Sequence, residues 1–164
     1  IDEECIRPIV SDHDFYSVKV AVNANAENPT KAFMEACVRG RKEYKGSGRP
    51  TLFTTEDLIA DMLLLEDKNG RKIHMSENDI KSALRVSDIV CVPDMVGLKR
   101  DNKDVLGIIV NLADYSVGAV KGGKMAMFDD FDIDYNQHKF LIETRMSGSL
   151  LKPASALVIE KANS

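Results

Sequence analysis

The order of the periodic patterns along this sequence limits its fold more than any other feature. Helical spacing of apolar residues dominates the first half of the 164 residues, and strand-like alternation dominates the second half. A chain with this order of patterns is typical of α+β folds, in which helices and a sheet pack against each other as layers. We therefore predict an α+β fold with a mixed β-sheet flanked by helices, as one domain or one domain with a small lobe.

Two helices are predicted before residue 65. The first begins at Asn28 and Pro29, because Asn is a favoured N-cap and Pro fits the first helical position. We expect it to stop only at the glycines at positions 46 and 48, with an apolar face made of Phe33, Ala36, Cys37, Gly40 and Tyr44. The second helix is capped by Thr54 or Thr55, and its inward side chains are Leu58, Ile59, Met62 and Leu63.

A tight turn and a third helix follow. Residues 67–70 read Asp-Lys-Asn-Gly, and Asn-Gly readily supplies the positive φ angles of a turn. Ser76 and Asp79 form a capping-box pattern. The helix that they begin has an apolar face of Ile80, Ala83 and Leu84.

Strands are predicted from alternation and from apolar runs. Val18, Val20 and Val22 alternate with smaller or polar residues, which indicates a strand with one buried face. Residues 89–92 and 108–112 are apolar on both faces, which is typical of central strands. The tail is rich in strand patterns, at residues 125–128, 131–135, 139–145 and 156–160.

Composition disfavours several classes of protein. A net charge of −4 is unlike the basic balance of a DNA-binding module, and the absence of Trp disfavours stacking platforms for single strands. Cys5, Cys37 and Cys91 are too far apart for a zinc knuckle, so we expect reduced thiols, with Cys91 inert in the core. No run is long enough to predict a membrane span, and no signal peptide is visible. The chain begins with Ile1 rather than Met, so we expect it to be part of a longer protein.

A phosphate-binding loop is the sharpest chemical candidate. Residues 118–124 have the spacing of such a loop as far as its Lys, which is Lys124. Met125 then stands where Ser or Thr would hold magnesium, and a strand pattern follows instead of a helix. We therefore interpret this stretch as a glycine-rich hairpin connection.

Two alternatives to a purely structural role remain open. The first is a metal-dependent enzyme, because the acidic run at residues 129–134 offers carboxylate ligands from Asp129, Asp130, Asp132 and Asp134. The alternation of Asp132 and Asp134 with Phe131, Ile133 and Tyr135 favours a half-exposed strand instead. The three histidines, His13, His74 and His138, share no ligand spacing. We therefore predict no catalytic residues, no metal and no cofactor.

The second alternative is a nucleic-acid-binding module. Its candidate is the basic segment, residues 39–49, which carries Arg39, Arg41, Lys42, Lys45 and Arg49. Such a cluster can contact phosphates. Glu43 interrupts it, and cations at a helix C-terminus also stabilise the helix dipole, which is the interpretation we favour.

Three stretches of the sequence resemble the major capsid proteins of tailed bacteriophages. One starts at Phe128 with FDDFDIDYNQ, continues through FLIETRMSGSL, and ends with ASALVIE at Glu160. The second is YKGSGRPTLFTT at residues 44–55, and the third runs from Met62 to Val86. Together the similar stretches reach across most of the chain from Ala32 onward.

The resemblance implies the capsid shell fold, which has an axial domain and a peripheral domain. The spine helix, extended loop and N-terminal arm of that fold have no counterpart in the sequence pattern, so we expect the C-terminal half of such a protein. We expect residues 23–128 to form the axial domain. Residues 1–22 and 129–164 would then supply strands of a discontinuous peripheral domain, with Val18, Val20 and Val22 pairing with the tail.

The same resemblance implies a structural protein and no enzyme. The chain would be a subunit of an icosahedral phage or prophage capsid in the virion, self-assembled from copies of itself in the bacterial cytoplasm. It would enclose DNA without sequence-specific binding and would contact no membrane. Alone, we expect it to be soluble and a monomer or a small oligomer. The subunit contacts are expected in the polar loop at residues 94–104, at Lys99, Arg100, Asp101, Lys103 and Asp104, for which a mobile surface connection is the equal alternative.

Overall fold

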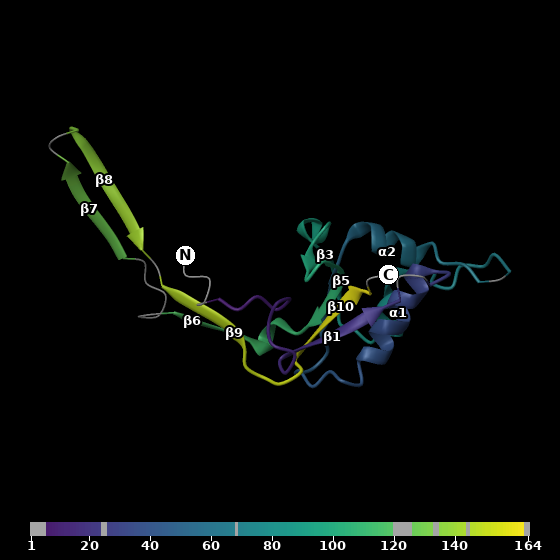
Figure 1. Cartoon of the computed structure of the whole chain (residues 1–164). Coiled ribbons are helices and arrows are strands. Elements are labelled where there is room, and N and C mark those ends of the chain that lie inside the picture. The colour runs from purple at the N-terminus through teal and green to yellow at the C-terminus, as the bar shows by residue number, and fades with distance from the viewer. Residues whose placement is uncertain are drawn as a thin grey trace.

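The computed structural model describes residues 6–23, 26–67, 69–119, 126–132, 135–143 and 145–162. A body of helices and sheet carries two consecutive two-stranded ribbons that reach away from it (Figure 1). The predicted α+β fold is confirmed. Its helices are α1 (Pro29–Gly40), α2 (Glu56–Leu63) and α3 (Glu77–Leu84). The strands of the body are β1 (Ser17–Val22), β2 (Thr51–Thr54), β3 (Ile89–Cys91), β4 (Lys99–Arg100), β5 (Lys103–Val110) and β10 (Ala156–Lys161). The ribbon strands are β6 (Tyr115–Ala119), β7 (Ala126–Asp132), β8 (Gln137–Glu143) and β9 (Met146–Leu150).

The body contains a six-stranded mixed sheet. Its order is β1-β10-β5-β2-β3, and β4 pairs with β5 off this path. The outer pairs β1–β10 and β2–β3 are parallel, whereas β5 runs antiparallel to both of its neighbours in this order. The predicted mixed sheet is therefore confirmed, and β5 lies at its centre.

The expected pairing of the first strand with the tail is also confirmed. In the β1–β10 ladder, Val18 lies opposite Leu157 and Val20 lies opposite Ile159. Because β10 also pairs with β5, segments 1–22 and 129–164 share this sheet with residues 23–128. The boundaries expected at positions 23 and 128 therefore do not separate two sheets.

The prediction that residues 89–92 form a central strand is wrong. They form the three-residue edge strand β3, in which Val90 and Cys91 are exposed, and Val92 lies beyond its end. A short apolar run does not distinguish a central strand from an edge strand that is covered on one face. The other predicted central strand begins earlier and ends earlier than expected, because Leu112 starts a short 3-10 helix, η3 (Leu112–Asp114).

Helix α1 packs on the sheet through the predicted face. The Asn28 side chain accepts a hydrogen bond from the Lys31 backbone N–H, as the N-cap prediction requires. Phe33 is fully buried, and its ring fits over Gly107 of β5, where an added Cβ would meet ring carbons at 3.1 Å. The helix ends at Gly40 rather than near Gly46, so Tyr44 lies in the following turn.

The second and third helices complete the layer. Of the predicted inward residues of α2, Ile59 and Met62 are buried. The capping box of α3 is confirmed, because Ser76 Oγ accepts from the Asp79 N–H and Asp79 Oδ2 accepts from the Ser76 N–H. Ala83 is exposed, contrary to prediction. Between these helices, the predicted turn is held by the Asp67 carboxylate, which accepts from two backbone N–H groups further along the turn.

The joint between the body and the ribbons is built on Asp114. This side chain is buried and accepts a 2.6 Å hydrogen bond from the Ser47 N–H, while Lys152 Nζ lies 3.1 Å from its other oxygen. Asn111 Nδ2 donates to the Ser47 carbonyl at 2.8 Å. Burial alone would raise the pKa of Asp114, but the bonds from Ser47 and Lys152 outweigh burial and hold the pKa below its usual value. These bonds tie the start of β6 and the end of β9 to the body.

We predict that Gly107→Ala destabilises the protein, because the new methyl group would press on the Phe33 ring and on Leu52. Overpacking of this kind costs about 1–3 kcal/mol, measured as the free energy of unfolding in urea. The matched control is Val38→Ala on the exposed side of α1, for which we expect a change within about 0.5 kcal/mol. Equal stabilities of the Gly107→Ala variant and the wild type would contradict this packing.

We predict that Asp114→Asn lowers the free energy of unfolding at pH 7 by about 1–3 kcal/mol, because a charged acceptor is lost from a buried site. Since the pKa of Asp114 is lowered in the folded state, its contribution is present above the unfolded pKa of about 4 and is lost as the pH falls through the folded pKa. Urea unfolding between pH 7 and pH 2 should therefore show a steeper acid loss in the wild type than in the variant. Parallel pH profiles would refute the assignment.

Candidate assembly surface

The two ribbons expose large apolar side chains that no part of the body covers. Strand β6 pairs with β9, and β7 pairs with β8, each in a two-stranded antiparallel ladder. Two-stranded ribbons are marginally stable on their own in water. The exposed apolar residues described on them are Val117, Met127, Phe128, Phe131, Tyr135, Phe140 and Met146. Apolar surface concentrated on a projecting element marks an interaction site.

The register of the outer ribbon places apolar side chains on both of its faces. Phe131 lies opposite His138, and Asp129 lies opposite Phe140, so these four share one face. On that face the Phe131 and His138 ring centroids are 4.9 Å apart, and the His138 and Phe140 rings stack at 6.2 Å. Phe128 alternates onto the other face. A ribbon with apolar residues on both faces needs a partner on each.

The acidic run lies mainly in this ribbon. As predicted, Asp132 belongs to a strand. Asp129 and Asp130, which lie between the two strands predicted at 125–128 and 131–135, belong to the same strand β7, and Ile133 and Asp134 lie outside the described residues. Asp129 Oδ1 is 3.6 Å from His138 Nδ1. Within the described ranges, no group of three or more His, Cys, Asp or Glu side chains is arranged to hold a metal ion.

The glycine-rich stretch does not lead into a helix. Gly118 and Ala119 are the last residues of β6, and the next described residue, Ala126, begins strand β7. The predicted strand after this stretch is confirmed. Residues 120–125, including Lys124, lie outside the described part of the chain.

The basic segment has Arg39 in the last turn of α1, and its other residues follow the helix. Arg39 pairs with Glu35 one turn earlier at 2.5 Å, and Lys42 lies 3.6 Å from Glu43. Arg41 folds over the Tyr44 ring, with its guanidinium carbon 4.8 Å from the ring centroid. Burial lowers the pKa of Arg41. Within the basic segment, the residues after Arg41 that carry an exposed positive charge are Lys42, Lys45 and Arg49.

The polar loop expected to contact other subunits contains a β-hairpin. Lys99 pairs with Asp104 and Arg100 pairs with Lys103, and the two central residues, Asp101 and Asn102, have φ of 48° and 63°. Two consecutive positive φ angles define the tight turn that suits strand twist. The segment is therefore a paired element and is not an irregular connection. The part of Lys99, Arg100, Asp101, Lys103 and Asp104 in subunit contacts stays a prediction.

Arg100 has a partner inside the chain that sequence analysis missed. Its guanidinium donates two hydrogen bonds, of 2.5 and 3.2 Å, to the carboxylate of Glu160, which is 2% exposed. Lys103 Nζ lies 3.9 Å from the same carboxylate. The hydrogen bond to Glu160 raises the pKa of Arg100. The available signal was a carboxylate at the end of the apolar run of β10, because a buried charge requires a partner.

The cysteines differ from expectation at one position. Cys37 is fully buried, and burial raises the pKa of its thiol. Cys91 is exposed, so its predicted place in the core is wrong, since β3 is an edge strand. A hydrogen bond with Glu56 raises the pKa of the Cys91 thiol and so disfavours the thiolate. Cys5 lies outside the described residues.

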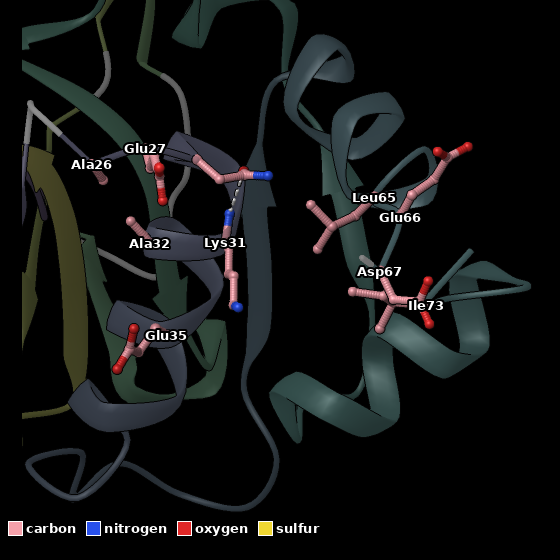
Figure 2. Close-up of a pocket in the computed structure, with 10 residues that line it drawn as sticks. Ala26, Glu27, Lys31, Ala32, Glu35, Leu65, Glu66, Asp67 and Ile73 are labelled. Carbon is pink, nitrogen blue, oxygen red and sulfur yellow. Dashed lines mark hydrogen bonds between the residues drawn. The ribbon is translucent and has the colours of Figure 1, made fainter. Parts of the chain in front are cut away.

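A cleft of about 470 Å³ separates α1 from the segment after α2. Figure 2 shows α1, with Lys31, Ala32 and Glu35, on one side, and Leu65, Asp67 and Ile73 on the other. Glu27 and Glu66 complete an acidic rim. We refer to this feature as the acidic cleft.

No helix in the described part of the chain is long and apolar enough to cross a membrane.

No protein-family model matches the chain, and no curated protein sequence matches it. Solved structures do. The chain is similar to a chain from the capsid of an empty GTA particle, with a TM-score of 0.56 and 12% identity, over 90% of this chain and 50% of that one. It is similar to a chain of Mycobacterium phage Ogopogo, with a TM-score of 0.53 and 12% identity, over 88% and 53% of the two chains. A chain from the capsid of a native GTA particle matches with a TM-score of 0.50 and 12% identity, over 90% and 54%.

The chain thus spans about half the length of the solved chains it matches. At this identity the likeness concerns the fold, and it extends over 90% of this chain. The α+β fold of this protein is the fold of about half of a phage-type capsid chain.

Proposed function

We propose that this protein is a structural subunit of a phage or prophage capsid and works by packing against copies of itself. The observation that carries the proposal is the agreement in fold with a capsid chain, which extends over 90% of the present chain. The two ribbons with uncovered apolar side chains support it, because a shell subunit needs extensive contact surface rather than a reactive pocket. The subunit would lie in the virion capsid, would be assembled in the host cytoplasm, and would enclose DNA without reading its sequence.

We propose a division of the subunit that follows the sheets. The six-stranded sheet with its three helices would be the axial domain, and the ribbons between Tyr115 and Leu150 would belong to the peripheral domain. This differs from a boundary at positions 23 and 128, because β1 and β10 belong to the body sheet. The buried carboxylate of Asp114 at the joint supports the new boundary.

These features support a structural role without catalysis. Neither the metal alternative nor the nucleic-acid alternative gains a specific observation. Asp129 faces aromatic rings, while Arg39 and Arg41 have partners within the chain. The contacts of Lys99, Asp101, Lys103 and Asp104 with neighbouring subunits belong to the same proposal.

We predict that the purified chain forms small, concentration-dependent oligomers through the outer ribbon. Replacing Phe131 and Phe140 by Ser removes two exposed rings from one face and should weaken association by about tenfold or more, since buried aromatic residues dominate such interfaces. Sedimentation velocity from micromolar to several hundred micromolar protein measures the dissociation constant.

Leu112→Ser, at an exposed apolar position in η3, is the control and should leave the constant unchanged. Thermal melting should show that the body remains folded in all variants. A wild type that stays monomeric over the whole range would contradict the proposed function. Unchanged association of the ribbon variant would remove the outer ribbon from the contact.

A further inference from the structure

The acidic cleft combines an apolar floor with an acidic rim. Leu65, Ile73, which is 47% exposed, and Ala32 of α1 are the apolar side chains of this lining. Among the described residues, four carboxylates line the cleft against one ammonium group, that of Lys31, and they belong to Glu27, Glu35, Glu66 and Asp67. Such a site suits side chains with an aliphatic stem and a cationic end, because the stem covers apolar surface while the charge meets the rim.

Matching side chains are present at the other end of the same helix. The basic segment presents Lys42, Lys45 and Arg49 at the surface directly after α1. The cleft runs along the first two turns of α1, from Asn28 to Glu35, and Arg39 of the same copy pairs with Glu35. The 12 residues of α1 span about 18 Å and separate Glu27 from Lys42, so Lys42 and Lys45 of one copy do not reach Glu27 of that copy.

The rim of the acidic cleft and the basic segment carry opposite charges near opposite ends of α1, so they would allow a head-to-tail contact between copies. Such a contact uses a different surface on each partner, and it either closes into a ring or continues as a filament. The net charge of −4 would make nonspecific approach of two copies repulsive. Local pairing of the acidic cleft with the basic segment would overcome this in one orientation only.

We propose that the acidic cleft of one copy binds the basic segment of a second copy, through Lys42 and Lys45, and that this contact orders the copies head to tail. The inference rests on the proposed function, since its partner is a second copy of this chain. The partner in this contact is distinct from the apolar partner surface of the ribbons.

Charge reversal on each side tests the contact with the complete chain. One variant carries Glu27→Lys and Glu66→Lys, which are exposed rim residues, and the other carries Lys42→Glu and Lys45→Glu. Glu35 and Asp67 are left unchanged, because Glu35 pairs with Arg39 and Asp67 holds its turn. Each variant should weaken self-association by about tenfold in sedimentation velocity at low salt.

The variant with all four reversals is the matched control. It keeps the net charge of −4 and exchanges the signs of the two surfaces, so its dissociation constant should return to within about threefold of the wild-type value. Lys161→Glu, at an exposed position of β10, should leave association unchanged. The milder pair Glu27→Gln and Glu66→Gln should give an intermediate loss, and it serves if the reversed rim lowers the melting temperature.

Carbodiimide coupling of carboxylates to amines gives a second readout. In a mixture of ¹⁴N- and ¹⁵N-labelled chains, mixed-isotope crosslinks should join Glu27 or Glu66 to Lys42 or Lys45. The absence of these crosslinks, or a four-reversal variant that associates as weakly as the two-reversal variants, would overturn the contact. If the ribbon variant loses association while all charge variants keep it, this contact fails and the proposed function stands.

Discussion

Strand β10 is the element on which the rest of the structure depends. It lies between β1 and β5, and all of its side chains from Ala156 to Glu160 are buried. Leu157 and Ile159 belong to the same core cluster as Phe33 of α1, whereas Val158 packs on the opposite side. Without this last strand, β1 would lose its only ladder partner among the described elements. The two ends of the chain are therefore joined at the centre of the body.

A buried charge within this strand connects the sheet to its surface. Glu160 is held by two hydrogen bonds from Arg100, and Arg100 belongs to the β4–β5 hairpin. A buried carboxylate without that guanidinium would carry an uncompensated desolvation penalty. The ion pair thus fixes the hairpin against the body, and the other charged side chains of the hairpin are held in place with it. Asp114 is a second buried carboxylate, just beyond the other end of β5, and its bonds to Ser47 and Lys152 anchor the ribbons.

The distribution of surface features follows from this arrangement. The body buries its apolar side chains between helices and sheet, and the ribbons leave theirs uncovered because each has only two strands. Helix α1 carries the acidic cleft along its first two turns and leads into the basic segment at its end. Apolar ribbons and charged ends therefore lie on different elements of the chain. These are properties of a subunit that meets its neighbours at several places.

The sequence by itself determined the features that depend on neighbouring residues. The start of α1 at Asn28, the capping box of Ser76 and Asp79, the turn at Asp67 and the alternation of β1 were all predicted correctly, because caps, turns and periodicity are local. The resemblance of its segments to capsid proteins also agreed with the fold.

Tertiary structure decided what depends on contacts between distant residues. The apolar run at residues 89–92 was predicted to be a central strand, but β3 lies at the edge of the sheet because it pairs with β2 alone. The early end of α1 places Tyr44 in the turn. The pairing of Arg100 with Glu160 joins residues 60 positions apart. Periodicity reports which face of an element is apolar, but it does not report which neighbour covers that face. For this reason the sequence predicted the elements, and only the folded chain defined the sheet order, the joint and the exposed ribbons.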